Sequence, residues 1–127
     1  MIVTGAFLAD YARRADDKLD VLGAVWDWCV LPDLTHTLEA YLVVLLQRGP
    51  DDVGVPGEMR VSVSDTVSDE PVHTAVLPVS GSLDGEQQAV AFPIALRCRT
   101  TGRHVLRIAM RDGDPGFTFS LDVRTLG

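Results

Sequence analysis

The chain has 127 residues, enough for one domain and too few for two of ordinary size, so we expect residues 1–127 to form a single domain. Hydrophobic residues make up 46% of it and charged residues 23%, a balance that supports a folded core and excludes a disordered tail. The net charge of −7 argues against a nucleic-acid groove, because such a groove needs clustered Lys and Arg.

The N-terminal stretch, residues 1–14, is apolar but lacks the basic start of a secretory signal, and Asp10 interrupts its apolar run. No stretch approaches the ~20 consecutive apolar residues of a membrane-spanning helix. We therefore expect a cytoplasmic protein that does not enter a membrane. Its two cysteines, Cys29 and Cys98, should then be reduced and buried as small hydrophobic residues.

Residues 2–31 predict two strands joined by a turn at residues 14–18. The turn sequence Arg-Ala-Asp-Asp-Lys lies between two apolar runs, and the second run is rich in Val and Trp, as strands are. A helix over residues 9–22 is the alternative, since it would place Tyr11 and Leu19 on one face.

The rest of the chain divides into alternating or apolar segments separated by turns rich in Gly, Pro and Asp. With the two N-terminal strands these segments make about eight strands. The pattern predicts an all-β fold, an antiparallel two-sheet β-sandwich or a flattened barrel. The later segments are residues 34–47, 58–65, 72–79, 89–99, 104–112 and 117–123.

The N-terminal strands differ from the later ones because they are apolar on both faces. Residues 38–46 carry Leu, Ala and Val on one side, and Tyr41, Val43 and Leu45 on the other. A chain of this length has little left to cover a second face apart from the loop at residues 48–57. A second subunit is therefore the expected cover, most simply in a C2 homodimer.

No catalytic or metal-binding motif is recognisable in the chain. Ser80 and Ser82 lack the G-x-S-x-G spacing of a nucleophile elbow, and the Gly-rich loops lack the lysine of a phosphate-binding loop. His36, His73 and His104 lie far apart in the sequence, so a zinc site would require them to converge in space.

Charged residues form two weaker patterns. Pairs of acidic residues in three turns could hold calcium if two turns met, but Asp is also a common turn former, which is the interpretation we prefer. Five arginines predict a solvated strand face, with an anion-binding patch as the alternative. The acidic pairs are Asp51 and Asp52, Asp84 and Glu86, and Asp112 and Asp114; the arginines are Arg97, Arg99, Arg103, Arg107 and Arg111.

Trp26 and Trp28 are the most unusual feature of the chain. In one continuous strand both rings lie on the same side, among apolar neighbours. A sugar-binding platform instead needs aromatic rings beside polar groups. We therefore expect both rings to be mostly buried in the core or in a subunit contact, Trp26 the deeper because it is farther from Pro32.

The first fifty residues carry a further pattern, a G-A-F-x-A-D strand followed by a Leu-x-Val-Leu-Gly-Gly-x-Trp return strand, with Ala24 in place of the second glycine. The matching positions are Gly5, Ala6, Phe7, Ala9, Asp10, Leu19, Val21, Leu22, Gly23 and Trp26. On these residues the chain resembles an uncharacterised family of small bacterial proteins, most familiar from actinobacteria. The resemblance implies a cytosolic bacterial protein of unknown function, with no activity or catalytic residue to carry over.

Together these patterns predict a non-enzymatic binding or assembly module that requires no cofactor. The most specific expectation is self-association through the N-terminal strands, with an unidentified protein partner as a further possibility. The alternatives are a carbohydrate- or calcium-binding sandwich and an enzyme whose site converges from distant residues. The candidate surface comprises Phe7, Tyr11, Trp26, Trp28 and Tyr41.

Overall fold

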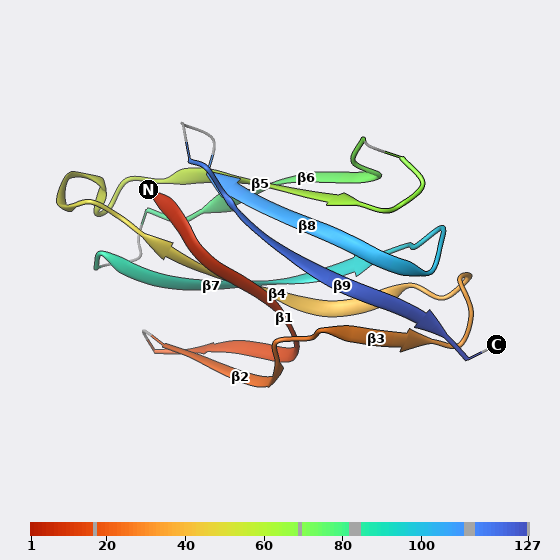
Figure 1. The fold of residues 1–127 in the computed structure, drawn as a ribbon. Helices are drawn as coiled ribbons and strands as arrows, with labels where there is room; N and C mark the ends of the chain where they lie inside the picture. The colour runs from red at the N-terminus through yellow and green to blue at the C-terminus, as the bar shows by residue number, and fades with distance from the viewer. Residues whose placement is uncertain (17, 69, 82–84, 111–113, 127) are drawn as a thin grey trace.

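Two β-sheets packed face to face make up this computed structural model, which describes residues 1–16, 18–68, 70–81, 85–110 and 114–126 (Figure 1). Within these ranges the strands are β1 (Ile2–Ala15), β2 (Lys18–Ala24), β3 (Trp28–Leu31), β4 (Leu38–Gln47), β5 (Gly57–Ser64), β6 (His73–Val79), β7 (Gln87–Leu96), β8 (Gly102–Met110) and β9 (Phe117–Thr125). A short 3-10 helix, η1 (Pro50–Asp52), lies between β4 and β5. One sheet has the order β2–β1–β4–β7, and the other has the order β3–β9–β8–β5–β6.

The prediction of an all-β, two-sheet fold is confirmed. The N-terminal hairpin is confirmed as well, since β1 and β2 pair as antiparallel strands with Ala15 opposite Lys18. The helix considered for residues 9–22 is therefore wrong. The described residues contain nine strands where about eight were expected, and one of the strand pairs, β3 with β9, is parallel.

The main core fills the space between the two sheets. It follows from the period-two alternation of the strands: Leu42 and Val44 of β4 are fully buried in the same cluster as Leu106 and Ile108 of β8. Burying one such side chain stabilises the fold by ~1.5–3 kcal/mol.

The described part of the chain holds no helix with the length and apolar character that spanning a membrane requires.

β1 pairs with two different strands along its length. Residues 2–9 pair with β4, and residues 9–15 pair with β2. Beyond Ala9 the hairpin turns beneath the outer face of its own sheet, so β2 contacts β7 although two strands separate them in the sheet order (Figure 1). The Arg14 guanidinium donates a hydrogen bond to the carbonyl of Ala89 in β7, which ties the hairpin to the far strand.

A second, smaller core lies under this hairpin. Ala9, Ala12 and Val43 are fully buried there, and five partly buried residues pack around them: Phe7, Leu19, Val21, Tyr41 and Ala91. The chain's own hairpin therefore covers part of the second apolar face of its N-terminal strands, while Leu45 on that face stays 40% exposed. This packing does not test the prediction of a dimer, which stays a prediction.

The single strand expected between residues 19 and 31 is broken into two. β2 ends at Ala24, and Gly23 and Val25 both take left-handed backbone conformations, with φ of 61° and 63°. The amides of Val25 and Trp26 donate to the Leu8 carbonyl at 2.9 and 3.3 Å. The chain then crosses to the other sheet as β3, which explains both the additional strand and the parallel pair.

Replacing Gly23 with Ala should destabilise the protein by ~1–3 kcal/mol, because the Cβ atom of an L-residue makes a left-handed backbone conformation unfavourable. A Cβ atom at this position would also collide with the Asp10 carboxylate, which would have to move. Chemical denaturation measures the change in unfolding free energy.

The matched control is Gly49→Ala, because Gly49 has an ordinary φ of −73° and the space for a Cβ atom. That variant should change the free energy of unfolding by less than about 1 kcal/mol. Equal destabilisation by the two substitutions would show that the turn at Gly23 does not depend on its left-handed conformation.

Candidate functional site

The five aromatic residues expected on one surface lie in three different environments. Phe7 and Tyr41 are half-buried in the core under the hairpin, and Tyr11, which is 44% exposed, meets Tyr41 edge-on with ring centroids 5.3 Å apart. Trp26 packs against the main core, and Trp28 lies on the outside of β3.

The structure confirms that Trp26 is mostly buried but corrects the same expectation for Trp28. The indole N–H of Trp26 donates to the Gly23 carbonyl at 2.9 Å, whereas Trp28 is 53% exposed. Trp26 is the deeper of the two, as predicted. The two rings do not share one strand face, because the backbone turn at Val25 resets the alternation and places Trp26 between β2 and β3.

Trp28 is held in place on the outer face of the five-stranded sheet. The Arg124 guanidinium lies over its ring, 4.9 Å from the centroid, a cation–π contact. Arg124 also donates to Asp122 at 2.8 Å. Because Asp122 is paired with Trp28 in the parallel register and Arg124 with Val30, these four side chains share one face at the edge of the sheet.

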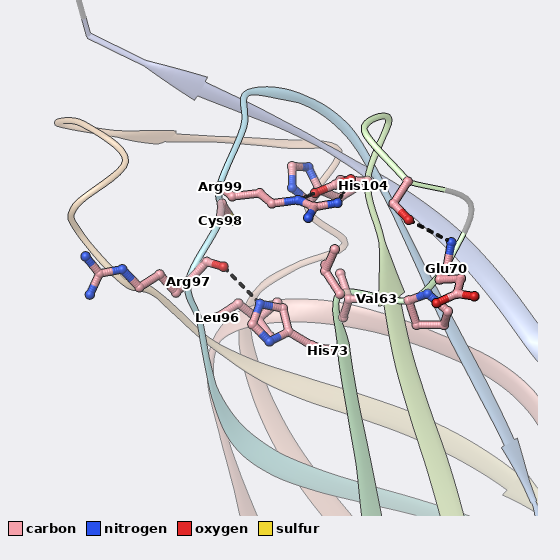
Figure 2. Close-up of a pocket in the computed structure, with 12 residues that line it drawn as sticks. Val63, Glu70, His73, Leu96, Arg97, Cys98, Arg99 and His104 are labelled. Atoms are coloured by element: carbon pink, nitrogen blue, oxygen red, sulfur yellow. Dashed lines mark hydrogen bonds and ion pairs between the residues drawn. The ribbon is translucent and has the colours of Figure 1, made fainter.

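A pocket of about 470 Å³ lies at one end of the sandwich, where the β5–β6 connection faces the β7–β8 connection (Figure 2). Its wall includes the ion pair between Asp65 and Arg99. The Asp65 carboxylate accepts from Arg99 Nε at 2.7 Å and from Arg99 Nη2 at 3.0 Å, and it also accepts from the Val67 amide at 2.9 Å. The hydrogen bonds from Arg99 hold the pKa of Asp65 far below its usual range, so this carboxylate stays ionised.

Two histidines that are distant in sequence converge on this pocket. His104 is only 3% exposed, and its Nδ1 lies 3.0 Å from the Gly102 carbonyl. Because a carbonyl only accepts, Nδ1 donates this hydrogen bond, and Nε2 is the other nitrogen of the ring. This Nε2 is buried and has no hydrogen-bond partner among the described residues. His73 donates from Nε2 to the Arg97 carbonyl at 2.9 Å, which leaves its Nδ1 as an acceptor (Figure 2).

The convergence of His73 and His104 does not make a metal site. No group of three or more His, Cys, Asp or Glu side chains among the described residues is placed to hold a metal ion. The third histidine, His36, is elsewhere, 3.0 Å from Asp33 through its Nδ1. The structure therefore gives no support to zinc coordination within the described parts of the chain.

The thiols are protonated rather than activated. Cys98 lines the pocket, and burial, followed by the charge of Asp65, raises its pKa. Burial raises the pKa of Cys29 to about 11, with smaller contributions from Cys98 and Asp122. Nucleophilic cysteines need the opposite shift. Both cysteines are free thiols, in keeping with the sequence-based prediction.

Two of the acidic residues of the turns, Asp52 and Asp114, have structural partners. Asp114 is buried, and its carboxylate accepts from the amides of Val3 at 3.0 Å, Met110 at 2.9 Å and Gly116 at 2.9 Å. Burial works to raise the pKa of Asp114, but these three donors outweigh it and lower the pKa. The Asp52 carboxylate pairs with the N-terminal ammonium at 3.2 Å.

The four described arginines of the predicted set do not form one strand face. Arg103 and Arg107 lie on β8, whereas Arg97 and Arg99 belong to the connection between β7 and β8. Four residues of the candidate sets lie outside the described ranges: Ser82, Asp84, Arg111 and Asp112.

The chain matches no protein-family profile and no curated protein sequence. The resemblance of its first fifty residues to a small bacterial family is not tested by these comparisons and stays a prediction.

Alkylation of the thiols tests the protonation argument. At pH 8 a thiol with a pKa of about 11 is ionised only to about one part in a thousand, so iodoacetamide should modify Cys29 in the native protein about a hundredfold more slowly than in the urea-unfolded chain. Mass spectrometry of the timed reaction provides the rates. Labelling of either cysteine at the unfolded rate would show that burial does not suppress its ionisation, and faster labelling would show that the site activates it.

Proposed function

We propose that this protein is a non-catalytic assembly module that associates with a second copy of itself through the exposed edge at β3. The observation that carries the proposal is the position of Trp28, more than half exposed on an edge strand. Three more exposed apolar residues lie near Trp28. Val25 and Val30 are close to it in the sequence, and Leu126 follows the end of β9, where its amide donates to the Leu31 carbonyl.

An exposed, fixed tryptophan favours association on energetic grounds. Burying the remaining half of the Trp28 ring would contribute ~2–3 kcal/mol at ~25 cal/mol per Å². Arg124 already restricts the ring, so little conformational freedom is left to lose on binding. An aromatic side chain with these properties is typical of the centre of a protein interface.

The pocket supports binding better than catalysis. Asp65 is ion-paired and Cys98 has a raised pKa, and neither is hydrogen-bonded to an imidazole among the described residues. A nucleophilic thiol needs an adjacent base or a lowered pKa.

Light scattering tests the assembly. The wild-type protein at ~100 μM should give a mass between the 13.8 kDa of one chain and twice that value, rising with concentration. Trp28→Glu should remain folded and give the mass of one chain at every concentration. Val76→Glu is the matched control, because Val76 is 56% exposed on β6 at the other edge of the same sheet, and it should behave as the wild type. A wild type that is monomeric up to 1 mM would contradict the proposal.

Binding of a small hydroxyl-bearing molecule in the pocket is a second candidate function, favoured by the unpartnered Nε2 of His104. An apolar slot of about 320 Å³ between β6 and β7 shares Val63, His73 and Leu96 with the pocket. A ligand with an apolar body and a hydrogen-bond-donating head matches this pair of cavities.

Octyl glucoside below its micellar concentration is a suitable probe, with octanoate as the control that has the same chain and no donor. The glucoside should raise the melting temperature of the wild type and octanoate should not. His104→Phe should abolish this increase, whereas His36→Phe, on the exposed β3–β4 connection, should keep it. An equal increase with His104→Phe would exclude the pocket as the binding site.

A further inference from the structure

The proposed self-association leaves open how two copies join, and the backbone of β3 bears on this question. In the five-stranded sheet β3 is an end strand, paired on one side with β9; none of the described strands pairs with its other side. The backbone amide of Asp122 donates to the Asp27 carbonyl at 3.0 Å, and the backbone amide of Leu126 donates to the Leu31 carbonyl at 3.2 Å. Odd-numbered residues of β3 therefore direct their polar groups toward β9.

The N–H and C=O groups of Trp28 and Val30 consequently point to the free edge, because polar groups alternate along a strand. Among the end strands described, β3 is the shortest, with four residues, and it alone contains neither a proline nor a charged residue. β6 contains Pro78, β7 contains Pro93, and β2 carries the charges of Lys18 and Asp20. Prolines and charges are the usual protection of a sheet edge against other chains.

Resting on the proposed self-association, we infer that two copies pair their β3 strands antiparallel, with Trp28 of each copy opposite Val30 of the other. This register uses all four free polar groups of each strand and creates one sheet that continues through both copies. Cys29 of each copy then lies at the two-fold axis. The arrangement is reciprocal, as a C2 interface requires.

The charge at the edge permits a second copy, and the exposed apolar area limits how tightly it binds. Residues 28–31 carry no charge, and the two Asp27 carboxylates at the ends of the paired strands would be at least ~13 Å apart, beyond the Debye length of ~8–10 Å. The exposed parts of Val25, Trp28, Val30 and Leu126 offer on the order of 400 Å² per copy, about half of what a standard stable interface buries. The dimer should therefore be weak, and its fraction should rise with protein concentration.

Val30→Pro separates strand pairing from simple contact between side chains. Proline removes the Val30 N–H, which faces the free edge, and spares the hydrogen bonds between β3 and β9. The variant should keep the circular dichroism of the wild type and give the mass of one chain at 500 μM by light scattering. A folded Val30→Pro protein that still dimerises would overturn strand pairing while leaving self-association in place.

A complementation experiment tests the register and does not depend on the proline variant. Trp28→Lys and Val30→Glu each place a charge on the edge, next to Asp122 and Arg124 respectively, where an opposite charge on β9 accommodates it. Each variant alone should be monomeric, because a charge faces an apolar residue of the other copy. Mixed, the two should form a heterodimer in which Lys at position 28 faces Glu at position 30.

The control mixture is Trp28→Lys with Val76→Glu, which should give no heterodimer. Failure of the first mixture to associate at 500 μM, with a wild type that does dimerise, would overturn the Trp28–Val30 register. A monomeric wild type would instead remove the self-association on which the register rests.

Discussion

The carbonyl oxygen of Leu8 accepts two backbone hydrogen bonds, from Val25 and from Trp26, at the point where β1 bends and the chain leaves β2. Leu8 is itself fully buried in the main core, so this junction cannot shift without disturbing the packing between the sheets. One half of β1 supplies the core, and the other half, with β2, covers the outer face of the same sheet. The left-handed conformations of Gly23 and Val25 are what allow the chain to reach this carbonyl.

The position of β3 follows from this junction. Once the chain crosses between the sheets after Ala24, it arrives beside β9 in the parallel direction and ends the five-stranded sheet. Trp26 lies within the crossing and packs inward, while Trp28 begins the edge strand and points outward. Two tryptophans separated by one residue thereby lie in different environments, Trp26 against the main core and Trp28 exposed at the edge of the sheet, where the proposed association would use it.

The acidic character of the chain is used for structure as much as for solubility. Asp114 joins the start of β1 to the end of β8 through three backbone donors, and Asp65 is fixed by Arg99 at the wall of the pocket. Carboxylates engaged in this way have lowered pKa values and satisfied lone pairs, so they are poor candidates for calcium ligands or for general acids. The buried imidazole of His104, with one nitrogen satisfied and the other not, is the polar group in this region whose role the fold alone does not explain.

The sequence by itself determined the class of the protein and most of its strands. Alternation with period two is a local property, because neighbouring side chains of a strand point to opposite faces, and so the hairpin at residues 14–18 and the strands around Met59, Leu106 and Phe119 could be located from residue order alone. The same argument indicated that the N-terminal strands are apolar on both faces, and the greater distance from Pro32 placed Trp26 deeper than Trp28.

Only the tertiary structure decided what packs against those faces, which tryptophan stays exposed, and that His73 and His104 meet in one pocket. Each of these outcomes depends on contacts between residues far apart in the chain: the hairpin reaching β7 at Ala89, the Leu8 carbonyl capturing Val25 and Trp26, and the β5–β6 and β7–β8 connections facing each other. A periodic pattern carries no information about such contacts, because it records the two faces of a strand but not which segment will lie against either of them.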